Sequence, residues 1–497
     1  MRAPLSSHSG IPWLAACAVA LVCAGCTVGP DFRTPDAPTA PRYTTAPEAP
    51  VVALPGATVP VLVAGRGLAP EWWTEFGSPA LDALVARALA NSPTLAQATA
   101  RLAQADEERR ARTGATEYPA VNATLGVNRE RVDPATFGFP EAPVPGPFTL
   151  YSVGLQVSYT FDMFGGTRRE LEALAAEVDY QRYQLEAARL TLAANVAATA
   201  IRRAGLAAQI DATQRIVAAQ RRQQDIVAQR YELGGVALLE LENQRALLAQ
   251  TESALPPLVA AHAQATHLLA VYTGVAPGEA ELPALRLSDL QLPAELPLSL
   301  PSQVARQRPD IRASEALLHK ASANVGVATA NLYPRITLSA SASPTQLSLS
   351  DLASSGLNIW SIGANLLQPV FRGGELTARK RAAVAAFEQA EAAYRDTVLQ
   401  GLRNVADVLR ALESDTQAQA SRSAQAAHAE AVYRIALGRY DDGGMSQLDV
   451  LDAERQRLAA GLARVQAETD RYADAVALLQ ALGGGWWNAP PPATDAR

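Results

Sequence analysis

Four segments of the chain alternate between apolar and small polar residues, the period-two pattern of a β-strand with two unlike faces. In residues 151–161 the odd positions carry Tyr, Val, Leu, Val, Tyr and Phe, while the even positions carry Ser, Gly, Gln, Ser and Thr. The same alternation recurs in residues 121–128, 336–343 and 360–366. With their flanks these segments reach about ten residues, the length that a tilted membrane strand requires. A soluble sheet with one wet face would alternate in the same way.

Two long stretches without proline predict very long helices. Proline is absent from residues 148–255 and 370–489. A helix from about Thr167 to Glu232 would be roughly 100 Å long at 1.5 Å per residue, and its partner would run from about Leu376 to Asp441. Pro256-Pro257 is expected to kink the first return helix. In the second long helix apolar residues follow the spacing of a coiled-coil seam, at Val384, Phe387, Tyr394, Val398, Val405, Val408 and Leu412.

The two halves of the chain repeat one another. The first half contains Arg230-Tyr231-Glu232-Leu233-Gly234-Gly235, and the second half contains the matching Arg439-Tyr440-Asp441-Asp442-Gly443-Gly444. In each half an earlier helical segment closes at a Tyr-Pro pair, Tyr118-Pro119 or Tyr333-Pro334. Each half is therefore expected to contain a helical segment, two strands, a long helix, a Gly-Gly turn and a return helix.

The repeat and two proline-rich stretches divide the chain into six segments. We expect a signal peptide (1–25), an N-terminal linker (26–70), a first repeat (71–274), a second linker (275–300), a second repeat (301–485) and a tail (486–497). The first repeat would hold strands at about 119–131 and 148–162 and a helical hairpin at about 167–273. The second would hold strands at about 334–344 and 357–370 and a hairpin at about 374–482.

The N-terminus has the features of an export signal. Arg2 precedes an apolar run, Ile11 to Val22, that is too short for a permanent membrane helix. The segment that ends at Cys26 resembles a bacterial lipobox, which predicts cleavage before Cys26 and acylation, for example with palmitate. A lipobox more often has Leu where Cys23 stands, and ordinary secretory cleavage would leave Cys26 as a free thiol. Thr27, rather than Asp, follows the cysteine, which favours the outer membrane.

Composition excludes several other classes of protein. All three cysteines lie in or at the end of the signal, so the mature chain has no pair for a disulfide. The formal net charge of −6 offers no basic surface for nucleic acid. His262 and His267 are five residues apart and do not share a helix face as metal ligands would. No catalytic residues, metal site or cofactor are expected beyond a covalent lipid on Cys26.

Four strands in one chain are too few to close a membrane barrel. An open sheet edge leaves backbone groups unpaired in hydrocarbon, so further strands must come from other copies, and three copies give twelve. The expected fold is mixed α and β: a trimeric twelve-stranded transmembrane β-barrel, with four strands per chain, continuous with a long periplasmic α-helical coiled-coil barrel. The alternative is a structural coiled-coil lipoprotein of the envelope without pore activity. A lipid-anchored enzyme has no support.

Several motifs connect the mature chain to a known family: Cys26-Thr27-Val28-Gly29-Pro30-Asp31-Phe32, Glu71-Trp72-Trp73, Arg439-Tyr440-Asp441-Asp442-Gly443, Leu448-Asp449-Val450-Leu451-Asp452, and Ala481-Leu482-Gly483-Gly484-Gly485-Trp486. With them the chain resembles the outer-membrane efflux proteins, the TolC-like trimeric ducts, and most closely the lipidated branch of tripartite multidrug (RND-type) systems. The resemblance implies a passive, gated outer-membrane exit duct for small molecules such as drugs. It also implies a homotrimer, a periplasmic adaptor (membrane fusion protein) and an inner-membrane pump.

The same resemblance implies roles for residues at the far ends of the helices. Asp449 and Asp452 would form an acidic ring at the closed periplasmic mouth, although acids in a first helical turn also favour the helix dipole. Tyr440, with Glu240 as its partner, would tether one hairpin to its neighbour. Some family members carry an arginine at the position of Met445, so this chain would close without it or use another residue. The hairpin-tip turns would face the adaptor through Gly234, Gly235, Gly443 and Gly444.

Overall fold

The computed structural model describes residues 27–44, 61–354 and 359–489 of the 497-residue chain. Cys26 and the signal peptide lie outside the described residues. The chain divides into two compact units. We call residues 1–34, 102–181 and 314–394 the strand unit, and residues 35–101, 182–313 and 395–497 the hairpin unit.

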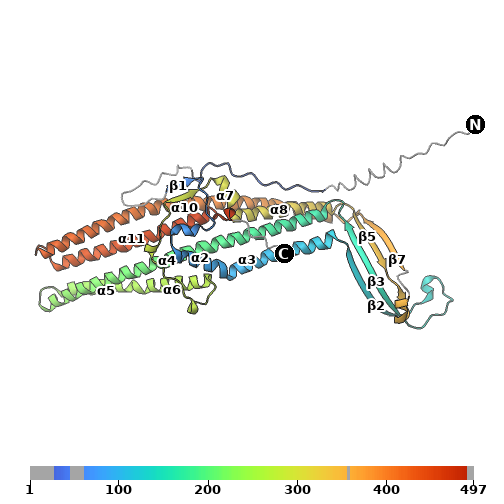
Figure 1. Cartoon of the computed structure of the whole chain (residues 1–497), viewed down its shortest axis with the longest axis horizontal. Helices are drawn as coiled ribbons and strands as arrows, with labels where there is room; N and C mark the ends of the chain where they lie inside the picture. The colour runs from blue at the N-terminus through green and yellow to red at the C-terminus, as the bar shows by residue number, and fades with distance from the viewer. Residues whose placement is uncertain (1–26, 45–60, 355–358, 490–497) are drawn as a thin grey trace, which may run out of the picture. The chain divides into compact units, whose positions relative to one another are not determined.

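The strand unit contains an antiparallel sheet in the order β2-β3-β5-β7, with a short strand β6 also pairing with β3 (Figure 1). The strands are β2 (Ala120–Glu130), β3 (Phe148–Phe161), β5 (Arg335–Ala342), β6 (Thr345–Gln346) and β7 (Trp360–Leu367). Both β2 and β7 are edge strands, so each presents one row of backbone groups with no partner strand in this sheet.

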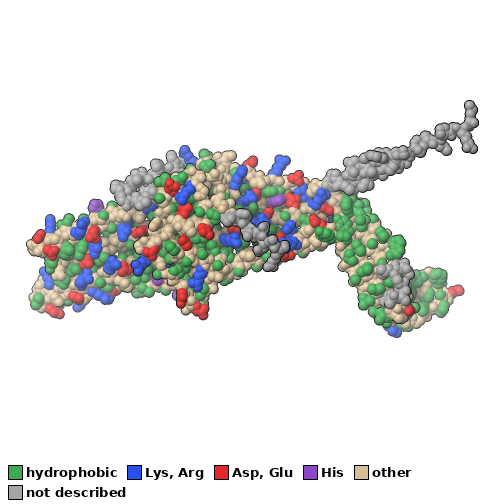
Figure 2. Space-filling model, viewed as in Figure 1, with side chains coloured by type: hydrophobic (Ala, Val, Ile, Leu, Met, Phe, Trp, Pro, Cys, Tyr) green, Lys and Arg blue, Asp and Glu red, His purple; other side chains and the backbone are tan. Residues whose placement is uncertain are grey.

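The strand register gathers the apolar residues on one face of the sheet. Val121 lies opposite Val157, Val157 opposite Ala340, and Ala340 opposite Ile362. The neighbouring row is polar throughout: Asn122, Gln156, Ser341 and Ser361. The large apolar side chains of the first face are exposed, and apolar side chains cover the strands in Figure 2. The alternation predicted from the sequence is therefore a true division between an apolar and a polar face.

Helical segments precede and follow the strands. They include parts of α3 (Pro93–Glu117), α4 (Gly166–Glu232), α8 (Pro309–Ala330) and α10 (Glu375–Asp441), with η2 (Pro134–Phe137) and α9 (Leu349–Ser354) in the loops. Pro119 and Pro334 stand immediately before β2 and β5. Because proline cannot continue a helix, the two Tyr-Pro pairs mark the change from helix to strand as predicted.

Two helical hairpins dominate the hairpin unit. Both α4 and α10 are 67 residues long, which confirms the two long helices predicted from the proline-free stretches. The first return helix is broken at Ala254 into α5 (Leu238–Ser253) and α6 (Leu255–Tyr272), because Pro256 and Pro257 lack the N–H groups that a continuous helix needs. The second return helix, α11 (Gln447–Ala481), is unbroken over 35 residues.

A small folded region also belongs to the hairpin unit. Strands β1 (Val61–Ala64) and β4 (Glu295–Leu298) pair in parallel, so two stretches expected to be linkers form a short sheet. Trp72 and Phe76 are fully buried beside the helices. The remaining elements are η1 (Trp72–Phe76), α2 (Pro79–Asn91), η3 (Pro277–Glu279), η4 (Leu287–Asp289), α7 (Pro301–Gln307) and η5 (Trp486–Asn488).

None of the helices among the described residues is both long enough and apolar enough to cross a membrane.

Candidate functional site

The tips of the two hairpins have the same backbone. Gly234 and Gly443 both adopt a φ of 73°, in the left-handed region that favours glycine. The N–H of Gly235 donates to the carbonyl of Arg230 at 2.7 Å, and that of Gly444 donates to the carbonyl of Arg439 at 2.8 Å. These bonds satisfy carbonyls at the end of each long helix, so the Gly-Gly pairs are helix-ending turns.

Asp449 occupies the first turn of α11 and completes a capping box there. Its carboxylate accepts from the backbone N–H of Ser446 at 3.3 Å and from the Ser446 hydroxyl at 2.6 Å, while Ser446 Oγ accepts from the Asp449 N–H at 3.3 Å. The two residues thereby satisfy N–H groups that the helix start leaves open. Asp449 has a structural role within its own chain whether or not it belongs to a gate.

Asp452 lies one turn further along α11 and is partly neutralised. Its Oδ1 accepts from Arg455 at 2.7 Å and 3.1 Å, and its Oδ2 accepts from Gln456 at 2.7 Å. The side chain is still 44% exposed. The structure therefore brings the two predicted gate acids to one end of one helix, with a cation from the same helix beside the second acid.

Tyr440 and Glu240 do not meet within one chain. Tyr440 is 40% exposed in the last turn of α10, and Glu240 is exposed in the first turn of α5. In the described part of the chain, no hydrogen bond joins these two side chains. The predicted tether therefore stays an expectation for two neighbouring copies.

Met445 fills the second tip with apolar contact. It packs with Tyr433 against Ala436, Val450 and Ala453. The guanidinium of Arg457 lies 4.7 Å from the centre of the Tyr433 ring, a cation–π geometry. Apolar packing around Met445 thus stabilises the second tip within one chain. Closure of a duct without an arginine at this position stays an expectation. The sequence shows only a lone Met there and gives no sign of this cluster.

The first tip, in contrast, exposes its leucines. Leu233, Leu238 and Leu239 are 87%, 51% and 72% exposed, and Tyr231 beside them is 40% exposed. We call these four residues the first-tip patch. Clustered exposed apolar residues are typical of surfaces that bind other proteins. The two tips therefore share one backbone but present different chemistry.

The residues that follow Cys26 are held by a buried arginine in the strand unit. Arg169 is only 4% exposed and forms ion pairs with Asp31 at 2.6 Å and with Glu172 at 2.7 Å. The N–H of Val28 donates to the carbonyl of Phe164 at 3.2 Å. We call residues 27–34 the N-terminal strap. Cys26, the predicted lipid attachment residue, lies immediately before the described part of the strap.

An aromatic contact and two glycines also position the N-terminal strap. Phe32 stacks on His319 with ring centres 4.3 Å apart, and His319 Nε2 is 2.9 Å from Glu172. A Cβ on Gly29 would collide with the Cα of Gly326 in α8, and a Cβ on Gly326 would collide with the side chain of Arg169. The packing of the strap, α8 and Arg169 therefore requires both glycines. The sequence offered residues 26–32 only as a family motif, since nothing in it indicates Arg169 as a partner.

A half-buried group of acids on α10 and α11 was also missed. Burial, a hydrogen bond with Asp415 and the charges of Asp415 and Asp470 together raise the pKa of Asp474 to about 7. Arg471, fully buried on the same turn of α11, donates to Gln419. Burial likewise raises the pKa of Tyr472 to about 12, and its hydroxyl donates to the carbonyl of Leu290 at 2.8 Å.

Comparisons with known proteins agree with this architecture. A family model described as outer membrane efflux protein matches residues 84–275 and 300–484. Over 441 residues the chain is 32% identical to the pyoverdine export outer membrane protein OpmQ of Pseudomonas aeruginosa, covering 86% of this chain and 90% of OpmQ. Over 471 residues it is 30% identical to the probable efflux pump outer membrane protein TtgC of Pseudomonas putida, covering 94% of each.

A solved structure gives the same result for the fold. The outer-membrane channel OprN has a TM-score of 0.80 and 30% identity to this chain, covering 93% of this chain and 100% of that one. The likeness confirms the predicted combination of long helices with strands. The family match in two segments, one in each half of the chain, supports the internal repeat.

Proposed function

Because the chain belongs to the outer membrane efflux protein family, we propose that three copies form a closed duct, with a twelve-stranded transmembrane barrel continuous with a periplasmic helical tunnel. The protein is an outer-membrane channel of an efflux system with a helical part in the periplasm, and it is not an enzyme. The observation that carries the trimer is the sheet of four long strands, which has two free edges and one exposed apolar face.

Edge pairing between copies would remove the two free edges. The β7 edge of one copy would pair with the β2 edge of the next, continuing the antiparallel order around the barrel. Every backbone group would then be satisfied inside the membrane, as hydrocarbon requires. The apolar face would meet lipid and the hydroxyl- and amide-rich face would meet the water of the pore.

Lipid on Cys26 would add a second attachment to the same membrane. The strap supports this assignment, because Arg169 and Phe164 hold residues 28–31 at the start of α4, close in sequence to the end of β3. Mass spectrometry of the N-terminal peptide tests it. An unmodified Cys26, or cleavage at another residue, would refute the lipid anchor.

The hairpin tips would form the periplasmic gate and the adaptor contact. Asp449 and Asp452 of three copies would contribute six carboxylates around one axis, with Tyr440 of one copy bonding Glu240 of its neighbour. A periplasmic adaptor would dock at the turns containing Gly234, Gly235, Gly443 and Gly444 and connect the duct to an inner-membrane pump. The cargo would be small molecules, in line with relatives named for pyoverdine export and antibiotic efflux.

Conductance and stoichiometry together test the duct. We expect the purified protein to run as a trimer in native mass spectrometry in detergent, and to conduct ions across a planar lipid bilayer. A structural coiled-coil lipoprotein would give neither a trimer with a pore nor conductance. A stable monomer, or a trimer that never conducts, would therefore refute the proposal.

A further inference from the structure

The polar face of the sheet is uncharged except at its two ends. Among the described residues that the register places on this face, the charged ones are Glu130, at one end of β2, and Arg335, at the start of β5. Between them lie hydroxyls, amides, glycines and a few apolar side chains. Arg335 therefore marks the helix-side end of this face with a positive charge.

Arg335 does not stand alone, because it lines a cavity with two other arginines. The cavity has a volume of about 220 Å³, and Arg372 and Arg379 from the start of α10 line it together with Arg335. Asn331 and Tyr333 add an amide and a phenol, while the other lining residues are Leu367, Pro369 and Leu376. No Asp or Glu is among the lining residues of this cavity.

Only part of this positive charge is neutralised. Glu375, beside the cavity, lies 2.7 Å from Arg379 and 3.8 Å from Arg372. In the described structure Arg335 donates to the side-chain oxygen of Asn331, which is not a charged partner. One carboxylate thus faces three guanidiniums, each with five N–H donors.

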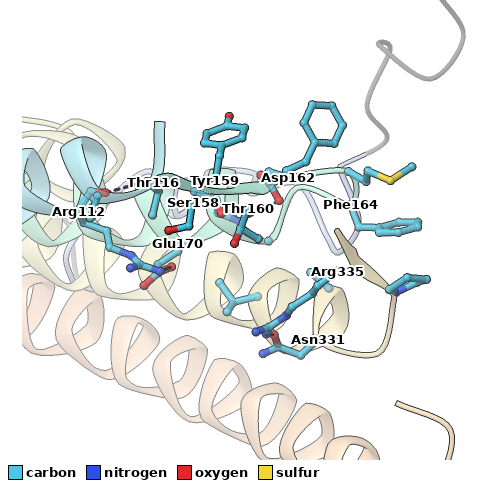
Figure 3. Close-up of a pocket in the computed structure, with 18 of the residues that line it drawn as sticks. Arg112, Thr116, Ser158, Tyr159, Thr160, Asp162, Phe164, Glu170, Asn331 and Arg335 are labelled. Carbon is cyan, nitrogen blue, oxygen red and sulfur yellow. Dashed lines mark hydrogen bonds and ion pairs between the residues drawn. The ribbon is translucent and has the colours of Figure 1, made fainter. Parts of the chain in front are cut away.

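The neighbouring cavity shows what a balanced site looks like in the same unit. It is larger, about 480 Å³, and Arg335 and Asn331 line it as well (Figure 3). There Arg112 is paired with Glu170 at 2.6 Å, and Asp162 caps α4 by accepting from the N–H groups of Thr167 and Arg168. Two arginines and two carboxylates line the larger cavity. Three arginines and no carboxylate line the smaller one.

We propose that the smaller cavity binds an oxyanion group (carboxylate, phosphate or sulfonate) of a small molecule passing through the duct, an assignment that rests on the proposed function. Guanidinium groups bind such oxyanions with two parallel hydrogen bonds. Arg335 and Leu367 both lie on the polar face, which puts the cavity on the water side of the sheet and away from lipid. The backbone is fixed there, since Gln368 donates to the carbonyls of Leu332 and Pro369 at 3.2 Å and 2.9 Å.

Calorimetric titration with citrate tests the site directly. The full chain, purified in a neutral detergent at low salt, is titrated as wild type and as Arg335→Gln, Arg379→Gln and Arg335→Lys. We expect citrate to bind the wild type, and each glutamine variant to bind about tenfold or more weakly, the usual effect of losing a charged hydrogen-bond donor. Arg335→Lys should fall between, because it keeps the charge but loses the planar fork. Arg422→Gln, an exposed position further along α10, should bind as the wild type does.

Two further readouts separate the possible failures. Citrate should reduce the conductance of the wild type in a planar bilayer, and Arg335→Gln should relieve that block. A conducting channel that citrate neither binds nor blocks overturns the anion site and leaves the duct intact, whereas absent conductance refutes the duct itself. A third outcome is that the wild type retains phosphatidylglycerol in native mass spectrometry but does not bind citrate, while the Arg335→Gln variant no longer retains the lipid. In that case the cavity is a lipid headgroup site and the cargo proposal is wrong.

Discussion

At the scale of single residues, Asp449 combines two demands on one carboxylate. The capping box uses its oxygens to complete the start of α11, while the proposed gate uses its negative charge. Alanine would remove both at once and could not distinguish them. Asparagine keeps a side-chain oxygen for the Ser446 N–H and removes only the charge.

We therefore expect Asp449→Asn with Asp452→Asn to reduce the cation preference of the channel and weaken block by divalent ions, because rings of carboxylates concentrate cations. Single-channel recordings measure both. Thermal unfolding should change little, whereas Asp449→Ala should lower the free energy of unfolding by about 0.3–1.5 kcal/mol through the lost capping box. If the double asparagine variant keeps wild-type selectivity and divalent block, the two acids are helix-start residues only.

Asp474 should make stability fall as pH rises. Its folded pKa of about 7 is far above the 3.8 of an ordinary aspartate, so the folded chain holds a proton that the unfolded chain releases. The contribution of this protonated carboxyl to the free energy of unfolding is fully present below about pH 4 and is lost as the pH rises through about 7. Asp474→Asn should raise the melting temperature more at pH 8 than at pH 5, measured by calorimetry. An equal gain at both pH values would contradict the raised pKa.

Arg169 should be the residue on which the N-terminal strap depends. Arg169→Gln removes the ion pairs with Asp31 and Glu172. We therefore expect the free energy of unfolding to fall by about 1–3 kcal/mol and hydrogen exchange in residues 27–34 to become faster. Hydrogen exchange with mass spectrometry measures the second effect. Arg168→Gln, one residue away and far more exposed, is the matched control. Equal exchange in both variants would show that the strap is held by other contacts.

At the scale of elements, the two faces of the sheet should respond oppositely to charge. Ile362 is 77% exposed on the apolar face of β7, and Asn365 lies on the polar face of the same strand. Ile362→Lys should destabilise the membrane-embedded form by about 2–4 kcal/mol, the effect of a cation facing mid-membrane lipid. Asn365→Lys should have little effect. Urea titration in lipid vesicles compares them, and similar stabilities would argue against a lipid-facing apolar surface.

Strands and long helices were predictable because each depends on a local periodicity. The alternation in residues 151–161 lies within β3, and the proline-free stretch from Thr167 to Glu232 corresponds to α4 with a shift of one residue. A proline in the interior of a helix removes a backbone hydrogen bond and kinks or breaks the helix. The effect of Pro256-Pro257 could therefore be predicted without knowledge of the fold.

Contacts between distant segments could not be predicted in this way. The pairing of β1 with β4 joins two proline-rich stretches more than two hundred residues apart, and neither shows the alternation of a strand. Arg169 with Asp31, Asp474 with Asp415, and the three arginines of the cavity each come together only through folding. Single charged residues carry no periodic signal, so the sequence leaves their partners open.

At the scale of the whole molecule, membrane attachment should survive loss of the lipid. Cys26→Ala with a cleavable secretory signal removes the acyl chain but leaves the strands, whose exposed apolar face would still require hydrocarbon. We expect the variant to remain in the outer-membrane fraction and to resist alkaline carbonate. Release into the soluble fraction would mean that the lipid is the main anchor and that the strands do not span the membrane.

The break at Ala254 makes the two hairpins mechanically unequal. Pro256 and Pro257 have no backbone N–H groups, so bending between α5 and α6 breaks few backbone hydrogen bonds. Bending α11 would break intact ones along its 35 residues. In any movement that spreads the tips, we expect the first hairpin to bend at this break and the second hairpin to move as a rigid body. In a duct of three such chains, hinged and rigid hairpins would then alternate around the axis.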